Sequence, residues 1–125
     1  MGGLDLDVDL NLVGRLCLAF LFLYRGATAL RELPRHTAQL AGRGVPAPGV
    51  VLALGLGTMF AGGLSVALDI QAAWGAAALI VFTVLANYCY HHFWAMTGME
   101  RRTHLYIFCN NVAVIGGLLL VIASR

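Results

Sequence analysis

Four runs of mostly apolar residues, each about 19–21 residues long, constrain this chain more than any other feature. They lie at about 10–30, 49–68, 72–90 and 105–123. A helix rises about 1.5 Å per residue, so about 20 residues cross the hydrocarbon layer of a membrane. Lipid offers the backbone no hydrogen-bond partner, which favours helices, and the runs lack the alternation of barrel strands. The sequence therefore predicts an all-α membrane protein, a four-helix transmembrane bundle.

Composition agrees with a lipid environment. The chain has 125 residues, of which 60% are hydrophobic and only 11% are charged, whereas a soluble domain has about 25% charged residues. A domain this small has too much surface to bury so many apolar side chains in its own core. We therefore expect residues 1–125 to form a single transmembrane domain. The net charge of +2 is too small to suggest a nucleic-acid partner.

The first residues are acidic. Leucine or valine alternates with aspartate over residues 4–10, and we expect a polar arm whose Asp9 or Asn11 caps the first helix. We do not interpret the first run as a cleaved signal peptide. A signal peptide has a basic segment before its apolar run, whereas this segment is acidic, and Arg15 and Arg25 interrupt the run.

The arginines are distributed unevenly among the connections. They occur in the first and third connections, at Arg31, Arg35, Arg43, Arg101 and Arg102, whereas the second connection has none. The positive-inside rule then places those two connections in the cytoplasm and both termini outside. All basic residues are arginine, and Ala, Gly and Leu are abundant, which suggests a bacterial inner membrane. Within the first connection a short helix is expected around 34–41, because proline suits a helix start.

Small residues mark the expected helix contacts. They recur every fourth position in the second run, at Ala53, Gly57, Ala61 and Ser65, and glycine pairs occur at Gly62, Gly63, Gly116 and Gly117. In lipid, small residues let two helix backbones approach closely. We therefore expect Gly57 and Ala61 to contact a neighbouring helix backbone.

Polar residues gather at one membrane level. The candidate ligand- or partner-binding residues are Arg25, Asn87, His91, His92, Asn110 and Asn111. A central arginine costs roughly 2.5–3.5 kcal/mol on insertion scales, so it usually faces the bundle interior and finds a partner. None of the four runs contains a carboxylate. Asn111 lies at a matching depth and can accept hydrogen bonds from Arg25.

Three interpretations of these polar residues remain open. They are polar contacts between helices, a site for the headgroup of a quinone or a lipid, or metal or haem ligation by His91, His92 and His104. The metal interpretation is the weakest, because adjacent histidines point to different faces of a helix and Glu100 is the only nearby carboxylate. No serine or cysteine has a neighbouring base. We predict no catalytic residue, no metal and no firmly bound cofactor.

Several short motifs together resemble the DoxX-like family of membrane proteins. They are the first-helix segment 15–26, Gly-Val-Pro-Ala-Pro at 44–48, Gly-Gly-Leu at 62–64, His-His-Phe-Trp at 91–94, and Asn111 followed by Gly-Gly-Leu-Leu at 116–119. The resemblance implies a four-helix bundle, often associated with redox or quinone-linked complexes. Met59 occupies a place where the family often has glutamate, which argues against proton or metal handling there.

Two functions are therefore carried forward. The first is a non-catalytic accessory subunit of a larger membrane complex, related to redox chemistry or electron transport, with lipid and other membrane subunits as partners. The alternative is a quinone-interacting component of a membrane oxidoreductase. A small transporter or channel is the weakest possibility, because no pair of ionisable residues lies near the expected membrane midplane.

Overall fold

The computed structural model describes residues 2–90 and 93–124, with side chains at 10–90 and 94–124, and this part of the chain is helical with no strand. Its elements are α1 (Gly2–Arg31), α2 (Leu33–Gly42), α3 (Pro48–Leu68), α4 (Ala72–Tyr90), the short 3-10 helix η1 (Phe93–Ala95) and α5 (Gly98–Ala123). Four segments are long and apolar enough to cross a membrane: Leu10–Arg31 within α1, and the whole of α3, α4 and α5. The predicted four-helix transmembrane architecture is confirmed.

The expectation of a polar arm before the first helix is wrong. Helix α1 begins at Gly2, so neither Asp9 nor Asn11 is a capping residue. No proline interrupts the acidic segment, and negative charge near a helix N-terminus is stabilised by the helix dipole. The helix therefore continues beyond the apolar run.

Helix α5 also begins earlier than its apolar run. The expected start was about residue 105, whereas the helix starts at Gly98. Its first turns are polar and include Glu100, Arg101 and Arg102, with Glu100 in the first turn, where a carboxylate favours a helix start. Hydropathy locates the lipid-facing part of a helix, and a polar extension can continue it into the membrane–water interface.

The first connection contains the expected short helix. Helix α2 spans Leu33–Gly42 with proline in its first turn, in agreement with the predicted 34–41. The chain then turns through Gly44 at φ 79° and Ala47 at φ 47°, and α3 begins at Pro48. Two prolines flank Ala47, and proline restricts the residue before it and starts a helix easily.

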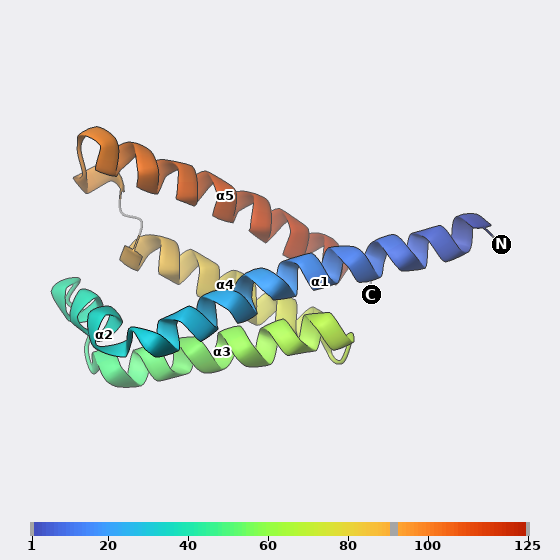
Figure 1. The fold of residues 1–125 in the computed structure, drawn as a ribbon, viewed down its shortest axis with the longest axis horizontal. Helices are drawn as coiled ribbons and strands as arrows, with labels where there is room; N and C mark the ends of the chain where they lie inside the picture. Colours follow the sequence, from blue (N-terminus) through green and yellow to red (C-terminus); the bar gives the residue numbers. More distant parts are fainter. Residues whose placement is uncertain (1, 91–92, 125) are drawn as a thin grey trace.

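The helices form an open bundle (Figure 1). Helix α1 packs along α3, α3 along α4, and α4 along α5, whereas contacts between α1 and α5 are restricted. In Figure 1, α5 approaches α1 near the C-terminus and diverges from it towards the end where α2 lies. The core is apolar, with Val66, Ala76, Leu79 and Leu118 fully enclosed. Large apolar side chains such as Leu54 and Trp74 point outward, as lipid contact requires.

Glycines permit the closest helix contacts. A Cβ atom on Gly62 would lie 2.8 Å from Leu79 Cγ and 3.2 Å from the Gly75 carbonyl oxygen. A Cβ atom on Gly63 would lie 3.1 Å from Leu23 Cδ2, and one on Gly117 of α5 would lie 3.2 Å from Leu18 Cδ2. Because these glycines have no side chain, α3 can pack closely against α4 and α1, and α5 against α1. An added side chain at these positions would force the helices apart.

The prediction that Gly57 and Ala61 contact a neighbouring helix backbone is wrong within the single chain. Among the residues that the structure describes, none lies within 4 Å of a Cβ atom placed on Gly57 or on Gly116, and Ala53 and Ala61 are exposed. The stripe lies on the face of α3 opposite to the buried Gly63 and Met59. A four-residue spacing identifies a helix face but not the neighbour that covers it.

Candidate functional site

A chain of polar side chains joins α1, α5 and α4. Arg25 Nη1 on α1 donates to Asn111 Oδ1 on α5 over 3.4 Å. Asn111 Nδ2 donates to Asn87 Oδ1 on α4 over 2.6 Å. The structure thus brings together three of the residues that the sequence placed at one membrane level. These bonds connect helices far apart in the sequence.

The two asparagines are fixed, whereas the arginine is open on one side. Asn111 is 2% exposed and Asn87 is 5% exposed. Because the Asn111 amide nitrogen donates to Asn87, its oxygen is turned towards Arg25. A guanidinium has five N–H donors, and Arg25, an exposed residue, uses one of them in a long bond to Asn111. The remaining donors are available to another group.

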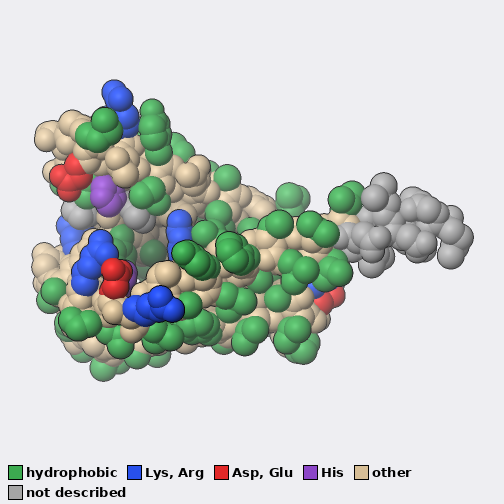
Figure 2. Space-filling view, viewed as in Figure 1, with side chains coloured by type: hydrophobic (Ala, Val, Ile, Leu, Met, Phe, Trp, Pro, Cys, Tyr) green, Lys and Arg blue, Asp and Glu red, His purple; other side chains and the backbone are tan. Residues whose placement is uncertain are grey.

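The arginine lies where α1 and α5 separate. Leu18 and Gly117 bring these helices together deeper in the bundle. Figure 2 shows the molecule hollowed between α5 and the side formed by α1 and α2, with arginine and histidine side chains in and around the hollow. The polar chain therefore runs from the buried Asn87 and Asn111 to an exposed end at Arg25.

The other predicted site residues lie elsewhere. Asn110 is exposed, on the side of α5 away from its buried neighbour Asn111. His91 and His92 lie outside the described residues. Within residues 10–90 and 94–124, no group of three His, Cys, Asp or Glu side chains could hold a metal. Met59 is 6% exposed and packs in the apolar core.

Arg15 joins α1 to the end of α3, a structural role that the sequence did not predict. Its Nη1 donates to the carbonyl oxygens of Val66 at 3.1 Å and Ala67 at 3.2 Å, and its Nε donates to Asn11 Oδ1 at 2.7 Å. The last carbonyls of α3 have no partner within their helix and carry partial negative charge. An arginine four residues after Asn11 in an apolar run was the only sequence signal, and the carbonyl partners could not be read from it.

Helix α2 is held to the end of α4. His36 Nδ1 lies 3.3 Å from Tyr90 Oη, and Arg43 Nη2 donates to the Tyr88 carbonyl oxygen over 3.2 Å. The Arg43 guanidinium also lies 5.2 Å from the centre of the Tyr88 ring, a cation–π geometry. Tyr88 and Tyr90 therefore fasten α2 and the residue after it to the end of α4.

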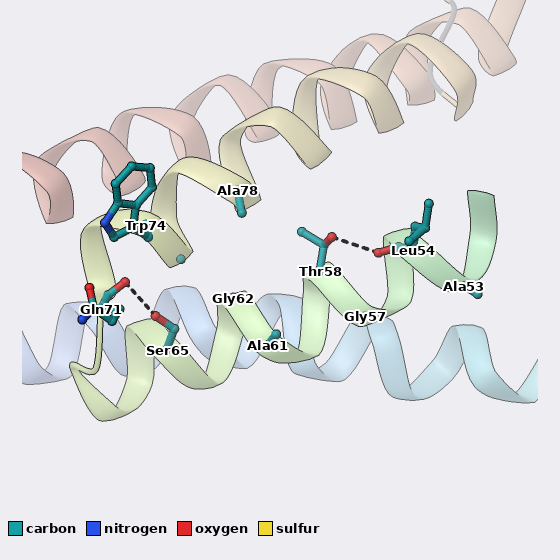
Figure 3. Close-up of a pocket in the computed structure, with 11 residues that line it drawn as sticks. Ala53, Leu54, Gly57, Thr58, Ala61, Gly62, Ser65, Gln71, Trp74 and Ala78 are labelled. Carbon is teal, nitrogen blue, oxygen red and sulfur yellow. Dashed lines mark hydrogen bonds between the residues drawn. The ribbon is translucent and has the colours of Figure 1, made fainter. Parts of the chain in front are cut away.

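A shallow groove runs between α3 and α4 on the outer surface (Figure 3). Its floor is the small-residue stripe of α3, and Trp74, Gly75 and Ala78 of α4 form its other side. Thr58 Oγ1 donates to the Leu54 carbonyl within α3. Ser65 Oγ lies 2.6 Å from the Ile70 carbonyl oxygen and 3.0 Å from that of Gln71, and closes the turn between the two helices. The described side chains that line this groove are all uncharged.

Comparison with known proteins identifies the family. A family model described as DoxX matches residues 10–92, which is more than half of the chain and includes its first three membrane helices. The motif at Asn111 and 116–119, part of the resemblance seen in the sequence, lies beyond the matched residues. No curated protein and no solved structure matches the chain. The family match and the four apolar helices establish that this chain belongs to the DoxX family of membrane proteins.

Proposed function

We propose that this chain is a non-catalytic accessory subunit of a larger bacterial membrane complex, related to redox chemistry or electron transport. The observation that carries the proposal is the outer groove of α3 and α4. Its stripe of Ala53, Gly57 and Ala61 exposes helix backbone, and none of the described residues occupies the space above Gly57.

The occupant that we propose is a transmembrane helix of a partner subunit. From Ala53 to Ser65 the stripe extends about 18 Å at 1.5 Å per residue, a length that more than three helical turns of a partner could follow. Small residues allow that helix to approach closely, and dispersion contacts and Cα–H···O bonds then favour association in lipid. None of the described side chains that line the groove is charged, so it suits an apolar helix rather than a soluble domain.

Gly57→Leu tests the accessory role. A Cβ atom added at Gly57 would meet none of the described residues within 4 Å, so the isolated protein should fold and melt as wild type. It would fill the groove, so the partner should no longer co-purify in mild detergent. Ala113→Leu on α5 is the control, because Ala113 is exposed outside the groove and its replacement should leave the complex intact. An intact complex with Gly57→Leu would contradict the proposal.

A second candidate function is a quinone-interacting component of a membrane oxidoreductase. The observation in its favour is the chain from Arg25 through Asn111 to Asn87, because guanidinium and amide donors can bind the carbonyl oxygens of a quinone. Decylubiquinone should then raise the melting temperature of wild type but not of Arg25→Gln. An equal shift in both proteins would argue against a quinone at this place.

A further inference from the structure

We propose that the hollow between α1 and α5 binds an amphiphile with an anionic headgroup, a phosphate or a carboxylate, through the guanidinium of Arg25. The proposal is independent of the accessory role, because the hollow and the outer groove lie on different helix faces. It also differs from the quinone alternative in requiring a negative charge.

The first argument is charge. Arg25 lies within a membrane-spanning segment, and the described carboxylates are Glu32, Asp69 and Glu100. Glu32 pairs with Arg35 at 3.0 Å, and no described carboxylate lies within 4.0 Å of Arg25. Its partner is the neutral amide of Asn111. A charge in a low-dielectric region is stabilised by an opposite charge much more than by one amide, so the site requires an anion.

The second argument is orientation. Asn111 is held by Asn87 and binds one edge of the guanidinium. Arg25 is exposed, and no other hydrogen bond joins its remaining N–H groups to the described residues. A guanidinium presents pairs of parallel N–H groups, which match the two oxygens of a phosphate or a carboxylate. The asparagines therefore position the arginine for such a headgroup.

The third argument is the apolar surface below the arginine. Between the level of Arg25 and the contact of Leu18 with Gly117, the partly buried apolar residues include Leu21 on α1 and Val114 on α5, which pack against the apolar core. The Arg25 Cα lies six residues, roughly 9 Å, before the end of α1. A headgroup drawn down to Arg25 would place an acyl chain along these residues. A free anion would gain nothing from them, which favours an amphiphile.

The experiment uses the full chain in a neutral maltoside detergent and follows thermal unfolding while dioleoylphosphatidylglycerol is added. A ligand that binds only the folded state raises the melting temperature. Arg25→Gln keeps a polar side chain but removes the charge, and the lipid concentration for half of the shift should rise at least about tenfold. Arg31→Gln removes an exposed arginine of the same helix and should change it less than about twofold.

Four other probes identify the headgroup. Oleate should stabilise wild type in an Arg25-dependent way, because it combines a carboxylate with a chain. Inorganic phosphate, which has no chain, and dioleoylphosphatidylcholine, which has no net charge, should bind at least about tenfold more weakly. An Arg25-dependent shift with decylubiquinone but none with phosphatidylglycerol would overturn the proposal and favour the quinone. Equal shifts with the two phospholipids would also overturn it.

A measurement on wild type covers the case in which Arg25→Gln does not fold. Phosphatidylglycerol with a photoreactive group beside its phosphate should label the segments around Arg25 and Asn111. Labelling confined to other segments would overturn the proposal. Gly57→Leu should bind phosphatidylglycerol as wild type does, so a failure of the accessory proposal would leave this result unchanged.

Discussion

Arg15 and Arg25, both within α1, have different hydrogen-bond partners. Arg15 is 8% exposed and donates to two carbonyls at the end of α3 and to Asn11. The negative end of the α3 dipole lies at that position, so Arg15 is both paired and structural. Arg25 is more exposed and has a single amide partner. We therefore expect stability to depend on Arg15 and ligand binding on Arg25.

Replacing Arg15 tests its structural role. Arg15→Leu removes the bonds to the Val66 and Ala67 carbonyls, and hydrogen bonds to charged groups contribute about 1.5–3 kcal/mol each. We expect the free energy of unfolding in detergent to fall by about 2–3 kcal/mol. Arg31→Leu, which removes an exposed arginine, should change it by less than about 0.5 kcal/mol. Equal effects of the two substitutions would contradict the role given to Arg15.

The asparagine pair can be measured with a double-mutant cycle. Asn87→Ala and Asn111→Ala each remove one side of the 2.6 Å bond, and interhelical hydrogen bonds in membranes couple by about 0.6–1.7 kcal/mol. We expect a coupling energy in that range from unfolding in detergent. Asn110→Ala should leave the free energy of unfolding unchanged, because Asn110 is exposed. Additive effects of the pair would show that the bond does not link α4 and α5.

At the scale of elements, α3 has two faces with opposite roles. Gly62 and Gly63 face α4 and α1 closely, whereas Gly57 and Ala61 face outward. The turn from α3 to α4 is tight, with Asp69 at φ 57° and Gln71 at φ 52°. The Ser65 hydroxyl closes this turn by donating to the carbonyl oxygens of Ile70 and Gln71. One face of α3 therefore holds the bundle together and the other remains available for a partner.

A pair of glycine substitutions separates these faces. Gly62→Val should lower the free energy of unfolding by about 1–3 kcal/mol, because its Cβ would lie 2.8 Å from Leu79 Cγ and overpacking costs about this much. Gly57→Val in the same helix should change it by less than about 0.5 kcal/mol, because no described residue lies within 4 Å of the added Cβ atom. Thermal or denaturant unfolding of the isolated chain measures both. A larger loss at Gly57 would contradict the assignment of faces.

At the scale of the whole molecule, charge and shape are both asymmetric. Arg35 and Arg43 lie on α2 or directly after it, whereas Asp69 lies at the opposite end of α3. The hollow opens at the end where α2 lies (Figure 2). The positive-inside rule would place this end in the cytoplasm, where anionic lipid headgroups are attracted by basic residues.

Cysteine labelling tests the orientation. Cys17, Cys89 and Cys109 are free and would first be replaced by serine. In that background, Asp69→Cys should react with an impermeant maleimide in intact cells, because we expect it outside. Arg35→Cys should react only after the membrane is permeabilised. Labelling of both positions from the same side would refute the predicted topology.

The sequence by itself determined the membrane class and most helix limits. A run of about 20 apolar residues has one stable form in lipid, because each backbone group must be paired within its own segment. This reasoning is local, and it predicted α3, α4 and the short α2 closely. It placed the starts of α1 and α5 several residues too late, because polar turns beyond the hydrocarbon leave no hydropathy signal.

Only the tertiary structure decided which faces meet. Depth along each helix could be counted from the sequence, and it placed Arg25, Asn87 and Asn111 at one level. The rotation of each helix about its axis depends on packing with distant segments, so the sequence could not separate Asn111 from Asn110 or Gly62 from Gly57. The Arg15 contacts with the end of α3 were invisible for the same reason, since backbone carbonyls carry no residue signature. The residues of each segment thus determine where a helix forms and how deep each residue lies. Packing between distant segments determines the polar chain, the hollow and the outer groove.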